Sequence, residues 1–328
     1  MPIKPRQTGG SSTFARKFKQ GMQARGHQVY FEHPGNYDVL LVVASCSLKY
    51  LIDAKARRKK IVHRLDGVYY PMSVAGRRWR RANIPLQIIH HFFSDYTIFQ
   101  SKFSRYSVEK FLGQNRFIPS QIIYNGVDTQ LFKPKGECAR LRDNKNQHIF
   151  ITTGRFRRDD QLEPILKAFE IYRQKYEANA KLYIIGNRQP KGQKVAASNG
   201  PVINIGPVPN HKLPMYLRAA DVFLFSHLNP PCPNNVLEAM ASGRPVCGVA
   251  DGAMHELTRQ GKNSELVPST PDNFSVPRQL DLTKFASNMH RIMQNQAKYS
   301  QQSRAHAAWN FSLAHMLDQY ENTLVSQS

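Results

Sequence analysis

The sequence predicts an α/β protein with two doubly wound parallel sheets that face each other across a cleft. Short apolar runs alternate with helix-like segments in both halves of the 328-residue chain, which is typical of parallel sheets covered by helices. The apolar runs are nearly continuous and rich in β-branched residues, as in strands buried on both faces. A polar, charged stretch at about residues 134–146 separates the halves, and we interpret it as a linker.

The first domain is expected at residues 1–135, with helix-like segments at 12–25 and 104–112. Its predicted strands are QVYFE, DVLLVVAS, KIVHRL, YTIFQS and QIIYNG. The second domain, residues 146–308, is expected to place strands at HIFITTG, KLYIIG, VINIG, DVFLFS and PVCGVA. The tail from Leu282 to Leu324 is predicted to be helical, and a break near Trp309 would let a last helix, about 309–328, cross back to the first domain.

The composition indicates a cytoplasmic protein that meets anionic partners. The net charge is +23, and through Pro134 there are 22 Lys and Arg against 7 Asp and Glu, a net of +15. Such a field attracts nucleic acid, anionic lipid or phosphorylated substrates. The sequence has no apolar run of the ~18 residues typical of a membrane span, and the N-terminus has no apolar signal core. The four cysteines lack CxxC spacing, so we expect reduced thiols.

Candidate ligand residues follow the strands of the first domain, because ligands of such sheets bind at the carboxyl ends of strands. Gly9, Gly10 and Ser11 precede a helix, whose free N–H groups suit a phosphate; a loop capped by serine is the alternative. Asp66 ends a strand and is placed either to meet a ligand or to form an Asp-Gly turn. For Asn125-Gly126 we favour a structural turn.

The second domain offers a basic loop at a strand end. Gly154 allows a turn after the strand HIFITTG, and Arg155 follows it. A guanidinium group at this place suits a diphosphate, although a solvated basic loop is the alternative.

The segment from Pro230 to Gly252 holds the most informative carboxylate, Glu238. Prolines stiffen the approach to a short helix, predicted at about residues 236–242 with Asn234 or Asn235 as its N-cap. A carboxylate in the first turn gains from the helix dipole without any ligand. Alternatively, the bare N–H groups hold a diphosphate and Glu238 holds a pair of ribose hydroxyls.

Several common sites are absent from the sequence. It contains no GxxxxGK[ST] phosphate loop, no GxSxG elbow, no Asp-x-Asp pair and no His/Cys cluster, so we expect no metal and no cofactor. Residues 77–93 are basic and then apolar with aromatics. This pattern predicts either an interfacial membrane segment or a partly buried helix with a solvated basic end.

Taken together, these residues resemble a retaining glycosyltransferase of the GT-B fold, with two Rossmann-like domains, from the large family 4 that uses nucleotide sugars. The resemblance runs in order through TGGSSTFARKFKQGMQARGHQV, IFQSKFSR, IIYNGVDTQLFKP, TTGRF, LYIIG, VINIGPVPNHKLPMYLRAADVFLFS and NNVLEAMASGRPVCGVADGAMHEL. The Asn-Gly-Val-Asp and Leu-Glu-Ala-Met-Ala segments are the most specific parts of it.

The resemblance implies roles for individual residues. Glu238 matches the second acid of a Glu–seven residues–Glu motif that holds the donor ribose, and Pro230 stands in the place of the first acid. The donor diphosphate would lie at Gly9, Gly10 and Ser11 and at backbone groups of Asn234, Asn235, Val236 and Leu237. Arg155 matches the phosphate-binding arginine. Asp160 stands where a lysine is usual, and Arg157 or Arg158 would substitute for that lysine. Asp66 occupies the place of a histidine near the reacting sugar.

The sequence and this resemblance together predict a metal-independent hexosyltransferase that moves a sugar from a nucleotide diphosphate to an acceptor hydroxyl, and the resemblance implies that transfer occurs with retention. We assign catalytic roles to Asp66, Arg155 and Glu238. The basic first domain predicts a glycan or lipid-linked acceptor and peripheral attachment to an anionic membrane, with no specific nucleic acid. Two alternatives stay open: a non-catalytic polyanion-binding or nucleic-acid-binding protein on a degenerate scaffold, and a sugar-nucleotide epimerase.

Overall fold

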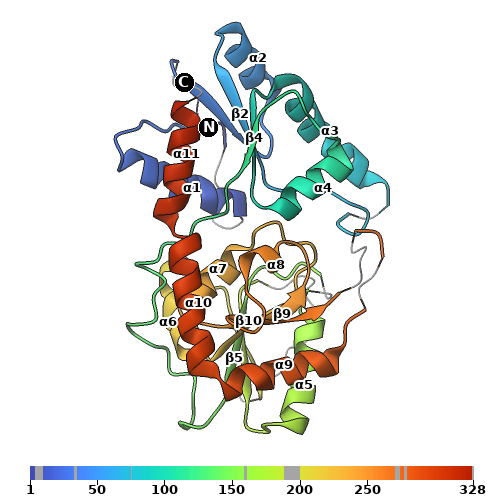
Figure 1. Cartoon of the computed structure of the whole chain (residues 1–328), viewed down its shortest axis with the longest axis vertical. Coiled ribbons are helices and arrows are strands. Elements are labelled where there is room, and N and C mark those ends of the chain that lie inside the picture. Colours follow the sequence, from blue (N-terminus) through green and yellow to red (C-terminus); the bar gives the residue numbers. More distant parts are fainter. Residues whose placement is uncertain are drawn as a thin grey trace.

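The chain folds into two α/β domains stacked along the long axis of the molecule (Figure 1). The computed structural model describes residues 1–3, 10–32, 35–74, 76–158, 161–187, 200–269, 274–276 and 279–326. Every strand pair in both sheets is parallel, so the predicted fold class is confirmed. None of the described helices has the length and apolarity that a membrane-crossing helix needs.

The first domain is built on a four-stranded sheet of order β1-β2-β3-β4. Its strands are β1 (Val39–Val43), β2 (Lys60–Leu65), β3 (Tyr96–Phe99) and β4 (Ser120–Ile122). Its helices are α1 (Gly10–Gln23), α2 (Leu48–Ala56), α3 (Arg78–Ile88) with the π turn η1 (Ile89–Phe93), and α4 (Lys102–Leu112).

Alternate residues of the first sheet face opposite helical layers. Leu41 and Val43 pack with the apolar face of α1, whereas Leu40 and Val42 pack with α2. In α1 this face is made by Phe14, Phe18 and Met22, whose spacing of four residues keeps them on one side of a helix. The final helix of the chain, α11 (Leu313–Val325), covers the same face as α1 through Met316, Leu317 and Tyr320.

The second domain has a six-stranded sheet of order β10-β9-β8-β5-β6-β7. The strands are β5 (Ile149–Thr153), β6 (Lys181–Ile185), β7 (Val202–Gly206), β8 (Val222–Phe225), β9 (Val246–Ala250) and β10 (Ser264–Pro268). The helices are α5 (Glu163–Lys175), η3 (Asn210–Lys212), α6 (Leu213–Ala219), α7 (Asn234–Ala241), α8 (Met254–Leu257), α9 (Leu282–Gln294) and α10 (Gln296–Asn310).

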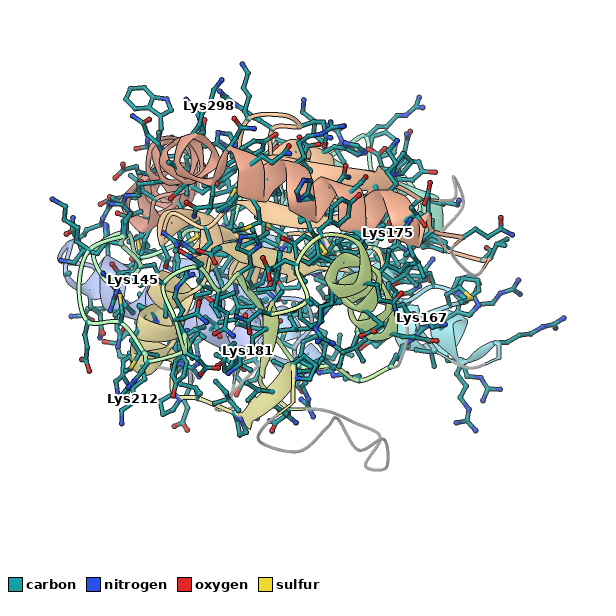
Figure 2. The ribbon with its side chains drawn as sticks, turned by 90° about the horizontal axis from the view of Figure 1, so that it is seen from below. Lys145, Lys167, Lys175, Lys181, Lys212 and Lys298 are labelled. Atoms are coloured by element: carbon teal, nitrogen blue, oxygen red, sulfur yellow. The ribbon has the colours of Figure 1, made fainter. Side chains whose placement is uncertain are left out.

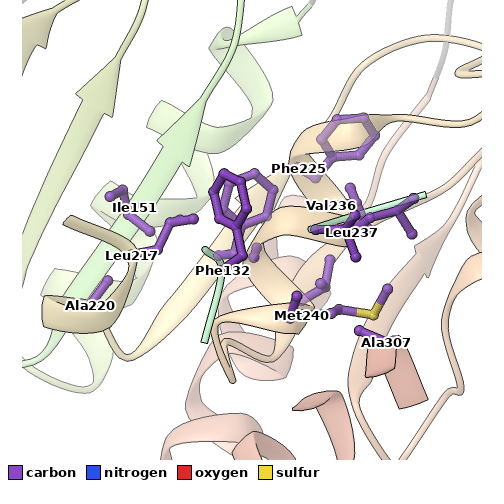
Figure 3. Packing of buried hydrophobic residues seen from close by; sticks show 14 of the residues in the cluster. Phe132, Ile151, Leu217, Ala220, Phe225, Val236, Leu237, Met240 and Ala307 are labelled. Carbon is purple, nitrogen blue, oxygen red and sulfur yellow. The ribbon is translucent and has the colours of Figure 1, made fainter. Parts of the chain in front are cut away.

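The core of the second domain lies on both faces of its sheet. On one face Phe150 packs with Phe169 of α5 and Met289 of α9. On the other face the α7 residues Val236, Leu237 and Met240 pack with α6, with β5 and with Ala307 of α10 (Figure 3). The helix that carries Glu238 is therefore held in place by its apolar side chains, which pack into the core of the second domain.

The chain crosses between the domains at Asn125–Asp128, where it leaves the first sheet, and again near Ser312. The backbone N–H of Val127 donates to the carbonyl of Phe311 over 2.8 Å, and Leu313 donates to Val127 over 2.8 Å. A Cβ atom on Gly126 would lie 2.7 Å from Cα of Leu313. The Asn-Gly pair was predicted as a structural turn; here it allows two crossing segments to touch.

One predicted strand is wrong. QVYFE (residues 28–32) forms neither helix nor strand, although Val29 packs against the core beside α1. β1 is the edge of the first sheet, and residues 28–32 form no ladder with it. A run of β-branched and aromatic residues forms a strand only where its backbone pairs with a neighbouring strand.

Candidate active site

The carboxyl end of β2 places a carboxylate between the domains. Asp66 follows β2 directly, and the next residue, Gly67, has φ +133°, a conformation that favours glycine. A Cβ atom on Gly67 would lie 3.8 Å from Cγ of Pro231 in the second domain. Asp66 therefore lies where the two domains meet.

Three side chains hold the Asp66 carboxylate. Ser11, at the start of α1, donates to Oδ2; Nε2 of Gln100 donates to Oδ1 over 3.1 Å; and Arg64 forms an ion pair with Oδ1. The structure thus brings together Ser11 and Asp66, two of the predicted site residues. Gly10 is exposed at the first position of α1, and no described residue lies within 4 Å of a Cβ built on it; Gly9 lies outside the described residues.

Arg64 is a candidate that the sequence analysis missed. Its side chain is only 1% exposed, and burial lowers its pKa. Beyond Asp66, its Nε donates to the Tyr320 hydroxyl over 2.9 Å and its Nη2 donates to Oδ1 of Asn125 over 2.8 Å. The guanidinium also lies 3.7 Å from the ring centroid of Phe14. One feature of the sequence could have indicated it: Arg64 precedes Asp66 by two residues at the end of a strand, and this spacing in extended chain puts both side chains on one face.

The second wall of the site lies at the switch point of the second sheet. The chain runs outward from β5 to β7 and then returns to β8 on the other side of β5. Ligands of doubly wound sheets bind at the carboxyl ends of strands at such a point. The loop after β5 carries Gly154 and Arg155, and the segment after β8 leads into α7 and Glu238.

The loop after β5 touches the start of α7. Gly154 has φ +158°, and a Cβ there would lie 3.6 Å from Nδ2 of Asn235. That amide donates to the carbonyl oxygen of Thr153 over 2.5 Å. Arg155 is exposed and makes no hydrogen bond or ion pair with a described residue, so its guanidinium is available to a ligand.

Arg158 has a different environment from Arg155. Its Nη1 donates to the backbone carbonyl of Met72 in the first domain. It therefore joins the second domain to the loop that follows Asp66. Asp160, which stands at the usual lysine position, lies outside the described residues.

Helix α7 begins at Asn234, two residues earlier than predicted, and its N-cap is Pro233 rather than an asparagine. Proline suits this place because its fixed φ fits a helix start. No acceptor for the backbone N–H groups of Asn234 and Asn235 occurs in the part of the chain that the structure describes, as is usual for a first helical turn. The side chains of Val236 and Leu237 point into the core (Figure 3), so only their backbone could serve a ligand.

Glu238 lies in the second turn of α7 and is 5% exposed. Its Oε1 is 3.7 Å from Nζ of Lys17, on α1 of the first domain, and accepts a 3.5 Å hydrogen bond from Nδ2 of Asn210. Burial raises the pKa of Glu238, and Lys17 opposes that rise. Lys17 and Asn210 were not found from the sequence, because their relation to Glu238 exists only in the folded chain.

The prolines before α7 form a contact with the first domain. Ser101 donates to the carbonyl of Pro231 over 2.6 Å, and the side-chain amide of Asn125 donates to the carbonyl of Cys232 over 2.9 Å. Pro230 itself is buried, and a Cβ on Gly252 would lie 2.4 Å from its Cδ. Position 230, where the resembling family has its first acid, is thus an apolar packing position here.

One wall of the site combines the buried carboxylate of Glu238 with helical N–H groups and an arginine that have no partner among the described residues. The other wall carries a second carboxylate, Asp66. Amide and guanidinium groups donate hydrogen bonds to phosphate oxygens. A carboxylate accepts hydrogen bonds from a pair of neighbouring hydroxyl groups. Within the described ranges, no group of three or more His, Cys, Asp or Glu side chains is placed to hold a metal ion.

Comparison with known proteins agrees with the fold. Residues 147–295, nearly the whole second domain, match the family model described as glycosyl transferases group 1. No curated protein sequence matches the chain.

Solved structures share the fold over almost the full length. The Anabaena protein Alr3699/HepE, crystallised with UDP and glucose, superposes with a TM-score of 0.73 at 17% identity, covering 98% of this chain and 97% of that one. Sucrose-phosphate synthase from Thermosynechococcus elongatus gives 0.69 at 19% identity, covering 96% and 78%. The pneumococcal O-GlcNAc transferase GtfA, in complex with UDP and GlcNAc, gives 0.63 at 15% identity, covering 88% and 56%.

Proposed function

We propose that this chain is a GT-B glycosyltransferase that transfers a sugar from a UDP-sugar donor to an acceptor hydroxyl group; its second domain matches the family model described as glycosyl transferases group 1. The observation that carries the proposal is the buried Glu238 behind the open N-terminus of α7, at the switch point of the second sheet. HepE has been crystallised with UDP and glucose and with UDP-glucose, which supports the choice of donor.

The donor would lie along the second wall. Glu238 would accept hydrogen bonds from the ribose hydroxyls, and the N–H groups of Asn234 and Asn235 would donate to the diphosphate. Arg155, exposed beside Gly154, would add a charge-assisted contact to the same phosphates. These donors would stabilise the charge that develops on the leaving UDP, so the transfer would need no metal ion.

Asp66 would contact the reacting sugar or the acceptor hydroxyl from the first wall. Because Arg64, Gln100 and Ser11 already hold its oxygens, its carboxylate is a fixed acceptor rather than a mobile one. The acceptor would attack from the face that the leaving group occupies, and the linkage would keep the configuration of the donor. The family match supports transfer over the epimerase and polyanion-binding alternatives.

We expect the first domain to receive a lipid-linked or anionic acceptor at a membrane surface. Ile84 and Ile88 are 48% and 39% exposed one turn apart on α3, and Arg77, Arg78, Arg80 and Arg81 surround the start of that helix. Apolar side chains beside a basic cluster suit the interface of an anionic bilayer. Lysines also project from the far end of the second domain (Figure 2), so part of the charge is a solvated surface away from this helix.

The assignments are tested by UDP-sugar hydrolysis or transfer in the presence of EDTA. We expect Arg155→Ala to lower kcat/KM by about 100-fold, in the range seen when one donor to a developing anion is removed. Glu238→Ala should raise KM for the donor by about tenfold or more. EDTA should leave the wild-type rate unchanged.

Arg140→Ala, an exposed arginine in the linker, is the matched control and should behave like the wild type. Wild-type rates in both Arg155→Ala and Glu238→Ala would exclude these roles, and loss of activity in EDTA would exclude metal independence.

A further inference from the structure

A lysine of the first domain reaches into the proposed donor site of the second. Nζ of Lys17 lies 3.7 Å from Oε1 of Glu238, and it donates to the carbonyl of Gly126 over 3.5 Å. The two side chains are only 16% and 6% exposed. This ion pair therefore spans the domains within a poorly solvated space and is not a surface contact.

The position of Lys17 on α1 explains its direction. Its neighbours Phe14 and Phe18 bury one face of the helix against the first sheet. Lys17 follows Phe14 by three residues and lies at the edge of that face, where its stem can pass along apolar surface while the ammonium group reaches Glu238 of the second domain. Lys19, two residues on, instead lies over the ring of Phe31, 4.8 Å from its centroid.

Glu238 needs such a partner. A buried carboxylate is costly unless it is paired and hydrogen-bonded. Burial raises the pKa of Glu238, whereas Lys17 favours its charged form. A charged carboxylate is the stronger acceptor of hydroxyl hydrogens.

The contacts of Glu238 also differ between its two oxygens. Lys17 and Asn210 both contact Oε1. Throughout the described ranges, no residue donates a hydrogen bond to Oε2. One oxygen is thus held by the protein, and the other is left for a ligand.

We propose that Lys17 completes the ribose site by holding Oε1 of Glu238, so that Oε2 receives the ribose hydroxyls when the first domain lies against the second. The proposal rests on the proposed function, in which Glu238 binds the ribose. Lys17 is a positioning residue here, because it acts through Glu238. Recognition of the nucleotide then depends on both domains, although the family match covers only the second.

The experiment measures Kd by calorimetry for UDP and for 2′,3′-dideoxy-UDP, which lacks both ribose hydroxyls. In the wild type the ratio of the two Kd values should be about ten or more, as expected for the loss of hydrogen bonds to a charged group. Lys17→Met should bring the ratio close to one, and Lys17→Arg should restore most of it. Lys19→Met, the same change on the same helix, should keep the wild-type ratio.

A double-mutant cycle shows whether Lys17 acts through Glu238. Lys17→Met should have little further effect on the ratio in a Glu238→Gln background, because residues that act as a unit are not additive. A wild-type ratio in Lys17→Met would overturn the inference. So would an equal loss of affinity for both nucleotides, since that assigns Lys17 to the phosphates or to the fold. A wild-type protein that binds UDP without preferring it to the dideoxy analogue would instead overturn the role of Glu238 itself.

Discussion

At the scale of single residues, the first domain holds buried ionisable groups in two opposite ways. Arg64 is buried as a cation, surrounded by Asp66, Asn125, Tyr320 and the ring of Phe14. His63, next to it on β2, points to the other face and is buried as a neutral ring. Its Nε2 lies 2.7 Å from the Ala44 carbonyl. A cation with four partners is tolerated in the core, whereas a histidine with one polar contact is not expected to charge.

The buried histidine predicts a loss of stability in acid. Burial, with a smaller effect of His90, lowers the pKa of His63 to about 3. In the unfolded chain the ring takes up a proton near pH 6.5, so the unfolded state binds more protons as the pH falls below that value. The free energy of unfolding should therefore fall with pH, by about 2 kcal/mol from His63 between pH 7.5 and 5.

Urea unfolding at these two pH values measures the effect. His63→Gln keeps an N–H donor for the Ala44 carbonyl but does not titrate, and it should show a smaller loss at pH 5 than the wild type. His255→Gln, on an exposed histidine, should retain the wild-type loss. If His63→Gln lost as much free energy of unfolding between pH 7.5 and 5 as the wild type does, His63 would not be the source of the pH dependence.

At the scale of elements, the segment Asn125–Asp128 is the junction on which α11 docks. Val127 exchanges backbone hydrogen bonds with Phe311 and Leu313, so the last helix is fixed where the chain first leaves the first domain. Tyr320 of α11 then reaches Arg64, which holds Asp66. The C-terminal helix α11 is thereby connected, through Tyr320 and Arg64, to Asp66 in the first wall of the site.

This junction predicts that Gly126 tolerates no side chain. A methyl group there would meet Cα of Leu313 at 2.7 Å and Cβ of Met316 at 3.0 Å, and backbone cannot move aside cheaply. Gly126→Ala should lower the free energy of unfolding by about 1–3 kcal/mol, the usual cost of overpacking.

Thermal unfolding with Gly10→Ala as the control tests this prediction. At Gly10, the first position of α1, no described residue lies within 4 Å of an added Cβ, so its substitution should not lower the melting temperature. Equal melting temperatures for Gly126→Ala and the wild type would contradict the packing argument.

At the scale of the whole molecule, several further contacts join the two domains. Glu256 of α8 accepts hydrogen bonds of 2.7 Å from the backbone N–H groups of Lys102 and Phe103, at the start of α4. The Tyr124 hydroxyl donates to the same carboxylate over 2.9 Å. Phe274 of the second domain stacks on Phe103 with the ring centroids 5.8 Å apart. The structure therefore shows the two walls of the site brought against each other.

The surface charge predicts membrane binding by the intact protein. The protein should float with vesicles that contain anionic lipid at low salt, and binding should weaken as salt screens the charges. Replacing Arg77, Arg78, Arg80 and Arg81 by glutamine should reduce flotation severalfold. The matched control replaces Lys145 of the linker and Lys167, Lys175 and Lys212 of the second domain, all labelled in Figure 2. Equal recovery of the protein with neutral and with anionic vesicles would argue against membrane binding by this arginine cluster.

The sequence by itself determined the fold class, most strands and the candidate site residues at the ends of those strands. The periodicity of apolar residues and the ends of strands are local properties of the sequence. Asp66, Gly154, Arg155 and Glu238 could therefore be identified as candidate site residues from the sequence alone. Only the tertiary structure decided which groups act on one another. The pairs Arg64–Tyr320 and Lys17–Glu238 join residues far apart in the chain, and residues 28–32 have the pattern of a strand but no partner. A buried charge is stable only beside its counter-charge, and that neighbour is set by packing, which no local pattern encodes.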